Sequence, residues 1–203
     1  MHISSYIKMD NFKKKYLSNF KNKPLKILDV GSQDVNGTYR PIFEDMGWQY
    51  IGCDMAAGKN VDVVLKDVYN WNEFESGSFD VVISGQVFEH IEYMWLTMLE
   101  IARVLKEAGL CCVIAPSAGN EHRYPVDCWR IYPDGFKALA MFSCLETLEV
   151  YTEWGNVQYL DDSGIWHDSV LIAQKPNFSK EKKDLFESKS MMAKLMAANG
   201  LFK

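Results

Sequence analysis

Short apolar runs alternate with amphipathic stretches along most of the chain. Near-continuous apolar character is typical of strands buried on both faces of a sheet. Five runs have it: residues 25–30, 48–54, 61–67, 78–85 and 110–117. Between them, residues 38–46 and 90–109 carry the spacing of helices, and Gly47 and Gly109 are predicted to end these helices.

The second half of the chain continues the alternation. A proline-acid-glycine turn opens a predicted helix over residues 133–142, and residues 144–154 and 166–176 predict two further strands. Because strand and helix alternate, the sequence predicts an α/β fold in which a parallel sheet carries helices on both faces.

The two ends of the chain predict helices outside this alternation. We divide the chain into an N-terminal helix and candidate lid (1–22), one domain (23–176) and a C-terminal helix (177–203), with Ser4 or Ser5 as the first helix's cap. The apolar face of the last helix needs a partner surface, on its own domain in preference to another subunit. Its apolar residues are Leu185, Phe186, Met192, Leu195 and Met196.

Composition narrows the classes of partner. The chain has 203 residues, 48% of them hydrophobic, and a formal charge of -5, which argues against a general nucleic-acid binder. Its five cysteines form no C-x-x-C pair, which favours reduced thiols in the cytoplasm. The N-terminus does not resemble a signal peptide, and no apolar run reaches about 20 residues. We expect a soluble, cytoplasmic monomer or homodimer without a membrane partner.

The segment after the first apolar run carries the first functional signal. In open α/β sheets a ligand binds beyond the carboxyl ends of the strands, and Gly31 would let the chain turn there and a ligand approach the backbone. A dinucleotide site would need G-x-G-x-x-G. Here Ser32, Gln33 and Asp34 follow the glycine, and an acid would repel a diphosphate. The pattern therefore disfavours NAD.

Five segments in order, within residues 25–176, resemble the class I methyltransferases that use S-adenosylmethionine (SAM), in particular the type 11 subgroup. They are ILDVGS (27–32), YIGCDM (50–55), LKDVYNW (65–71), FDVVISGQVFEHI (79–91) and ARVLKEAGLCCVIAPS (102–117). The resemblance implies a Rossmann-like fold with a mostly parallel seven-stranded sheet, and SAM as cofactor.

The resemblance also implies where the cofactor binds. Asp54 would accept hydrogen bonds from both ribose hydroxyls. Asp67 would contact the adenine amino group, and Val68 would supply its backbone N–H. The first motif departs from the family where Gln33 and Val35 replace its usual glycines. The predicted cofactor-binding residues are Asp29, Gly31, Ser32, Gln33, Asp54, Met55, Asp67, Val68, Ser84 and Gln86.

Candidate residues for the chemistry lie in two loops, 84–90 and 115–132. His122 is the favoured general base, with His90 as second candidate, because histidine titrates near neutrality. The predicted substrate-binding residues are Tyr6, Arg123, Tyr124 and Arg130. The alternative for the second loop is a structural one, with Trp129 stacking and Asp127 paired to an arginine.

Metal use is the remaining alternative at the first loop. One branch of the family binds a divalent metal around an E-x-x-E-H pattern. Here Gln86 replaces the first acid, while Glu89 and His90 remain. We therefore predict no metal ligand, and expect Glu89 to begin the following helix.

Chain length and charge favour a small-molecule acceptor. The segments SQDVNGTYRPIF (32–43) and YPVDCWRIYPDGF (124–136) resemble methyltransferases that accompany bacterial surface-polysaccharide synthesis. That resemblance implies O-methylation of a sugar, a nucleotide sugar or a phosphorylated precursor, including a capsule phosphoramidate. The alternatives are a protein or RNA methyltransferase, or a SAM-binding partner subunit without catalysis.

Overall fold

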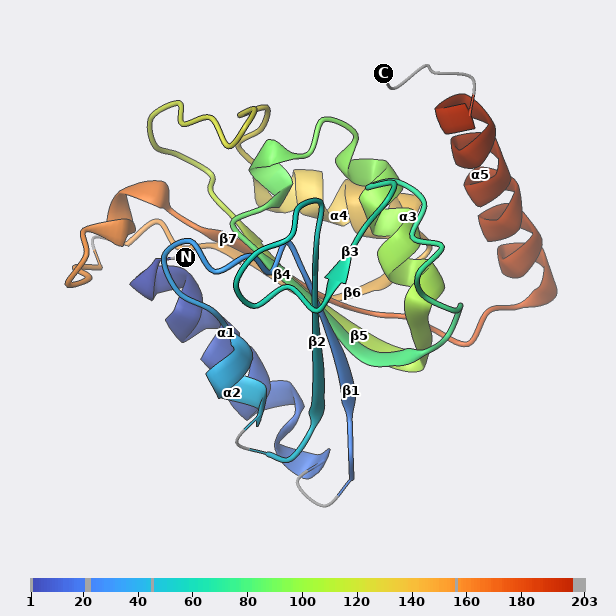
Figure 1. The fold of residues 1–203 in the computed structure, drawn as a ribbon, viewed down its shortest axis with the longest axis horizontal. Coiled ribbons are helices and arrows are strands. Elements are labelled where there is room, and N and C mark those ends of the chain that lie inside the picture. The colour runs from blue at the N-terminus through green and yellow to red at the C-terminus, as the bar shows by residue number, and fades with distance from the viewer. Residues whose placement is uncertain (1, 21–22, 45, 156, 199–203) are drawn as a thin grey trace.

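The computed structural model describes residues 2–20, 23–44, 46–155 and 157–198, and within these ranges seven strands form one sheet (Figure 1). The strand order is β3-β2-β1-β4-β5-β7-β6. β7 runs antiparallel to β5 and β6, and the other neighbouring strands are parallel. The strands are β1 (Lys26–Val30), β2 (Gln49–Asp54), β3 (Val63–Val64), β4 (Phe79–Gly85), β5 (Leu105–Ala115), β6 (Glu146–Thr152) and β7 (Ser169–Gln174).

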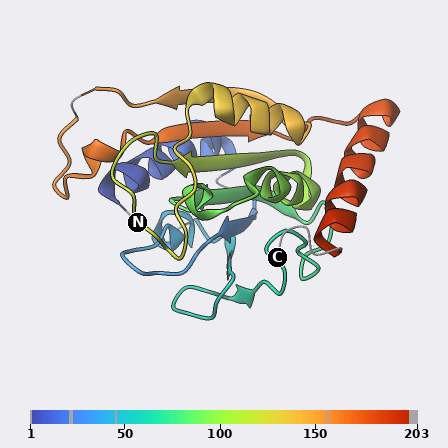
Figure 2. The same ribbon diagram turned by 90° about the horizontal axis from the view of Figure 1, so that it is seen from above.

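Helices cover both faces of the sheet. α1 and α2 lie on one side and α3 and α4 on the other, while α5 stands at the end of the molecule (Figures 1 and 2). None of the helices in the described ranges is long and apolar enough to cross a bilayer. The helices are α1 (Ile3–Tyr16), α2 (Arg40–Glu44), α3 (Met94–Val104), α4 (Pro133–Phe142) and α5 (Lys180–Ala198), and the 3-10 turns are η1 (Ser18–Phe20), η2 (Phe88–His90) and η3 (Ser163–Trp166).

The sheet divides the core into two clusters. Adjacent residues of β1 serve opposite faces: Ile27 packs with the α1 side and Leu28 with the α3 side, and neither is exposed. A strand buried on both faces needs apolar residues at every position, not at alternate ones. The predicted Rossmann-like fold, with a mostly parallel seven-stranded sheet, is confirmed.

Several predicted boundaries are wrong. Gly109 does not end α3, which stops at Val104, because Leu105 already pairs with Phe79 of β4. The strand predicted over residues 61–67 shortens to Val63–Val64. Of the helix predicted over residues 38–46, the structure shows Arg40–Glu44 as helical, and residue 45 lies outside the described ranges.

Ser4 and Ser5 do not cap α1, which begins one position after His2. Both serines are buried within the helix: Ser4 Oγ donates to Asp168 at 2.7 Å, and Ser5 Oγ shares a hydrogen bond with the Tyr39 hydroxyl. Lys8 is also buried and donates to Glu153 at 2.8 Å. These polar contacts fasten α1 to distant parts of the chain.

α5 contacts the domain through part of its apolar face. Phe186 is buried and packs against Phe178, and Lys189 donates to the carbonyl of Phe142 at the end of α4. The remaining large apolar side chains are exposed: Leu185, Met191, Met192, Leu195 and Met196.

We expect Phe12→Ala to lower the free energy of unfolding by about 3–5 kcal/mol, because this buried ring fixes α1 on the sheet. Ile7→Ala is the matched control on the same helix, since Ile7 is 43% exposed, and should change it by less than about 0.5 kcal/mol. Urea unfolding of both variants is the measurement. Equal, small effects would show that α1 is not part of the core.

Candidate active site

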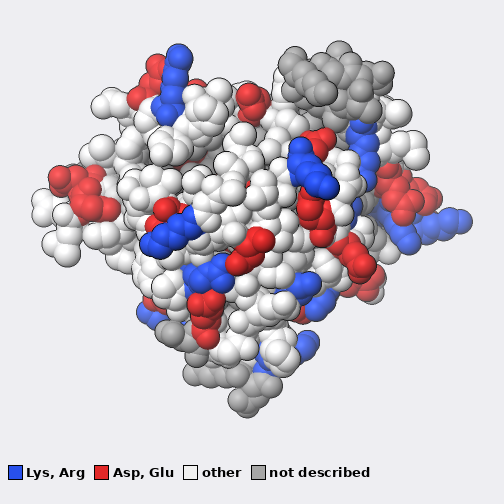
Figure 3. Space-filling view, viewed as in Figure 1, with Lys and Arg blue, Asp and Glu red and all other residues white. Residues whose placement is uncertain are grey.

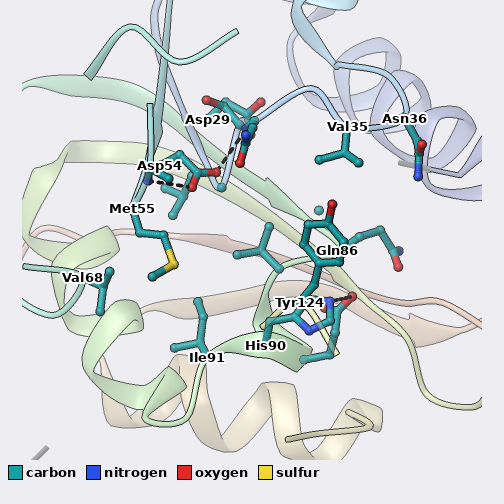
Figure 4. Close-up of a pocket in the computed structure, with 18 of the residues that line it drawn as sticks. Asp29, Val35, Asn36, Asp54, Met55, Val68, Gln86, His90, Ile91 and Tyr124 are labelled. Atoms are coloured by element: carbon teal, nitrogen blue, oxygen red, sulfur yellow. Dashed lines mark hydrogen bonds and ion pairs between the residues drawn. The ribbon is translucent and has the colours of Figure 1, made fainter. Parts of the chain in front are cut away.

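A cleft of about 640 Å³ lies where the carboxyl ends of β1, β2 and β4 meet. Asp54, Met55 and Val68 lie along one side, and Val35 and Asn36 along the opposite side (Figure 4). The remaining walls come from η2 and from the loop that follows β5. The cleft is therefore at the sheet edge where the sequence predicts a ligand.

Gly31 makes the turn that opens the cleft. Its φ is +76°, which favours glycine, and a Cβ at this position would lie 2.3 Å from Val87 Cγ2. The backbone N–H groups of Gly31 and Ser32 both donate to the carbonyl of Cys53, at 2.8 and 3.0 Å. These bonds hold the turn after β1 against the end of β2.

Asp54 ends β2 beside this turn. Its carboxylate accepts the N–H of Gln33 at 3.1 Å and the N–H of Ala56 at 3.3 Å. A carboxylate offers about four acceptor positions, so two remain for hydroxyl donors. Because Asp54 lines the cleft, the geometry suits a ligand with two adjacent hydroxyls.

Asp29 lies beneath the turn, 3% exposed, and accepts a hydrogen bond from the Tyr50 hydroxyl. Burial raises the pKa of Asp29 to about 7, although the Tyr50 bond and the charge of Arg40 act in the opposite direction. This carboxyl therefore holds a proton over much of the pH range in which an exposed aspartate is charged.

The Met55 side of the cleft continues into an apolar slot. Leu65, Val68 and Trp71 line it, and Trp71 Nε1 donates to the carbonyl of Val68 at 2.9 Å. Asp67 lies outside the residues that line the cleft, and its carboxylate accepts the N–H of Tyr69 at 2.8 Å. An apolar slot of this kind fits a flat aromatic base.

Gln86 directly follows β4 and lines the cleft. Its backbone is left-handed, with φ +60°, and its Nε2 donates to Asp168 at 3.0 Å. The other oxygen of Asp168 accepts from Ser4 of α1. A buried carboxylate thus joins the cleft to the N-terminal helix.

Glu89 and His90 in η2 meet His122 from the loop after β5. His90 Nε2 lies 3.6 Å from Glu89 Oε1, and the two histidine rings are edge-to-face with centroids 5.0 Å apart. Glu89 is fully buried, with no hydrogen-bond partner for either carboxylate oxygen. Burial raises the pKa of Glu89 to about 8 and lowers the pKa of His90.

The second loop is held by an ion pair, as the structural alternative predicted. Arg130 donates to Asp127 at 2.7 and 2.9 Å, and these bonds lower the pKa of Asp127 to about 2. Trp129 Nε1 fixes the same loop by donating to the carbonyl of Ile91 at 2.9 Å. This frame presents Arg123 and Tyr124 to the cleft.

Most of the predicted site residues come together. Those that line the cleft are Asp29, Gly31, Ser32, Gln33, Asp54, Met55, Val68, Gln86, His90, His122, Arg123 and Tyr124. Four others are absent from the lining: Asp67, Ser84, Tyr6 and Arg130. Ser84 is buried and donates to the carbonyl of Val30, whereas Tyr6 packs against the α1 side of the core.

Sequence reasoning missed several residues that line the cleft, including Leu65, Trp71 and His2, and it misjudged Glu89. Glu89 was expected to begin the following helix and not to bind a metal. It lies instead in the 3-10 turn η2, five residues before α3 begins, and its carboxylate is buried in the cleft wall. His2 reaches the cleft from the opposite end of the chain and stacks on Trp166. The comparison with the E-x-x-E-H pattern had marked Glu89, but a charged side chain normally predicts exposure, so its burial could not be predicted.

Residues 28–113 match the family model described as a methyltransferase domain. The chain therefore carries a methyltransferase domain of the SAM-dependent kind. No curated protein matches this methyltransferase in sequence.

Solved structures share its fold at low identity. A SAM-dependent methyltransferase from Archaeoglobus fulgidus is 15% identical, with a TM-score of 0.59, over 84% of this chain and 95% of its own. One from Methanosarcina mazei is 13% identical, with a TM-score of 0.61, over 81% and 98%. A protein from Galdieria sulphuraria, provisionally described as a sarcosine dimethylglycine methyltransferase, is 15% identical, with a TM-score of 0.62, over 84% and 86%. At these identities the likeness concerns the fold.

The cleft of this methyltransferase fits its cofactor. Asp54 offers acceptors for the ribose hydroxyls, and the Leu65–Val68–Trp71 slot suits the adenine. A side chain at Gly31 would overlap Val87, which also lines the cleft. SAM supplies an electrophilic methyl group on a sulfonium, so the protein's task is to bind it and to align an acceptor opposite the sulfur.

We expect Asp54→Ala to weaken SAM binding at least about 10- to 150-fold, since one hydrogen bond to a charged group contributes about 1.5–3 kcal/mol. Asp134→Ala removes an exposed carboxylate from the first turn of α4 and should leave the affinity unchanged. Isothermal calorimetry with SAM measures both. Wild-type affinity in Asp54→Ala would remove this residue from the cofactor site.

Asp29 should make stability depend on pH. Its folded pKa of about 7 lies above the unfolded value of about 3.9. The folded state therefore binds the extra proton, and its stability should fall as pH rises from about 4 to 7, by up to about 1.4 kcal/mol per pH unit. Asp29→Asn should lose this component. Urea unfolding of the two proteins across that range measures it, and parallel stability curves would contradict the assignment.

Proposed function

We propose that this methyltransferase methylates an oxygen of a small anionic acceptor: a sugar, nucleotide sugar or phosphorylated precursor of a bacterial surface polysaccharide, including a phosphoramidate. We also propose that it works in the cytoplasm. The cysteines described are all free, and four of the five are buried, which agrees with a reducing compartment.

The proposal of an anionic acceptor rests on the position of Arg123 in the lining of the cleft. Among the described residues that line the cleft, it is the only lysine or arginine. Its partner is Glu121 at 2.8 Å, and both side chains are largely exposed. Because an exposed ion pair is weak, a phosphate or carboxylate of the acceptor can replace Glu121.

Tyr124, also in the lining, and Trp166 beside His122 place aromatic surface near this arginine. Aromatic faces with polar edges suit a sugar or nucleotide ring. The resemblance of residues 32–43 and 124–136 to polysaccharide-associated methyltransferases supports the same class of acceptor.

The reaction forms a bond between the acceptor oxygen and the methyl carbon and breaks the bond from that carbon to sulfur. The electron pair of the broken bond stays on sulfur, which leaves S-adenosylhomocysteine. A hydroxyl acceptor must also lose a proton, and we propose His122 or His90, which both line the cleft, as the group that accepts it in a metal-free site. A phosphate oxygen arrives ionised and needs no base.

Figure 3 shows the charge on one face of the molecule. Lysine and arginine are scattered among aspartate and glutamate on the coloured part of that face, without a continuous basic area. This supports a small acceptor in preference to RNA, which binds through extended basic surface.

The direct test is the release of S-adenosylhomocysteine from SAM with a panel of acceptors. The panel should hold nucleotide sugars, sugar phosphates and phosphoramidates beside the matching neutral sugars, a bulk RNA and a protein extract. Turnover with the anionic small molecules supports the proposal. Turnover with RNA or protein alone, or SAM binding without turnover on any acceptor, would contradict it.

We expect Arg123→Ala to raise KM for the anionic acceptor about 3- to 10-fold, because a solvent-screened cation is lost, and to leave the Kd for SAM unchanged. Lys137→Ala is the control, since Lys137 pairs with an exposed aspartate on α4 away from the cleft. Steady-state kinetics measures both variants. An unchanged KM in Arg123→Ala would exclude this arginine from the acceptor site.

A further inference from the structure

Glu89, His90 and His122 form a cluster of metal-ligating side chains in the wall of the cleft. One ligand atom from each lies within 4.8 Å of the others. Two ligands come from η2 after β4, and the third comes from the loop after β5. We infer that these three residues bind one divalent transition-metal ion.

Glu89 provides the observation that points independently to a ligand. Its side chain has no exposed surface, and neither carboxylate oxygen has a hydrogen-bond partner. A buried carboxylate without partners is costly, and a cation is the partner that would offset this cost. The carboxylate belongs to the cleft wall, so a metal bound to it would face the cleft.

His90 is oriented as a metal ligand. Its Nδ1 lies 2.6 Å from the carbonyl of Val126, and a carbonyl only accepts hydrogen bonds. Nδ1 therefore carries the ring proton and Nε2 keeps its lone pair on the side of Glu89, 3.6 Å from Oε1. Metal-bound histidines usually donate their other ring nitrogen to a carbonyl or carboxylate in this way.

His122 also has hydrogen-bond acceptors near one of its ring nitrogens. Its Nδ1 lies 3.3 Å from the carbonyl of Asn120 and 3.6 Å from Asp127. Arg130 Nη2 is 3.5 Å from the same nitrogen, but it donates to Asn120 and Asp127 at 2.7 and 2.9 Å. The carbonyl and the carboxylate thus favour the proton on Nδ1, which leaves Nε2 for a metal.

The two ligand-bearing segments are tied together. The carbonyl of Glu89 accepts the N–H groups of Cys128 and Trp129, at 2.7 and 3.2 Å. Ligands of a tetrahedral ion at about 2.1 Å lie roughly 3.4 Å apart. Because the three ligand atoms lie within 4.8 Å of one another, the widest pair needs to close by about 1.4 Å at most. Side-chain rotation can supply that movement on a fixed backbone.

The ligand types select the metal. Two imidazoles and one carboxylate suit Zn²⁺, Co²⁺ or a similar ion, whereas Mg²⁺ prefers oxygen ligands. Three protein ligands leave at least one coordination position open toward the cleft. If the proposed function holds, an acceptor hydroxyl would occupy that position, where the metal lowers its pKa so that its proton leaves for water. His90 and His122 would then act as metal ligands, and neither would serve as the general base that a metal-free site would need.

Binding of Co²⁺ and Zn²⁺ to chelator-treated protein tests the site without any acceptor. Co²⁺ should give visible absorption of a low-coordinate N/O site at one ion per chain, and Zn²⁺ should displace it. Glu89→Gln and His122→Asn should each weaken Zn²⁺ binding about 100-fold or more, since loss of an outer partner alone costs 10- to 100-fold. The Kd for SAM checks that both variants fold.

Two controls exclude adventitious binding. His167→Asn changes a histidine that does not line the cleft and whose Nδ1 lies 2.9 Å from the carbonyl oxygen of Glu153. Cys128→Ser removes the exposed thiol nearest in sequence to the cluster. Both should keep wild-type metal affinity. No binding at millimolar Zn²⁺, equal binding in Glu89→Gln, or loss of binding in Cys128→Ser would each overturn the inference, and none of these results bears on whether the acceptor is anionic.

Discussion

The turn at Gly31 is the constraint on which the cleft depends. Its left-handed backbone and the hydrogen bonds that Gly31 and Ser32 donate to Cys53 place the end of β1 beside the end of β2. Asp54 is fixed by the same turn, because its carboxylate accepts the N–H of Gln33. A backbone that could not adopt this conformation would lose both the entrance to the cleft and the orientation of the Asp54 carboxylate.

The strands and their order of appearance could be predicted because burial on both faces leaves a local trace. Ile27 and Leu28 are adjacent and both fully buried, so apolar character is continuous along β1. The end of α3 could not be predicted, since it depends on Leu105 pairing with Phe79, 26 positions earlier. Gly109 was the stronger local signal, but a sheet contact between distant residues overrides helix propensity.

The site shows the same division between local and distant causes. Gly31 and Asp54 belong to short motifs beside strand ends, and both line the cleft. Asp168 had no such motif, although it connects Gln86 with Ser4 across the molecule. Such three-dimensional contacts, and the ion pair that engages Arg130, decide which polar residues face the ligand and which hold a loop.

The most direct test of this account is a crystal structure of the protein with S-adenosylhomocysteine. The account predicts that the ribose hydroxyls lie within hydrogen-bond distance of the Asp54 carboxylate, with the adenine against Leu65 and Val68 and the sulfur facing the space between Gln86 and His90. A cofactor bound elsewhere, or one whose ribose makes no contact with Asp54, would contradict it.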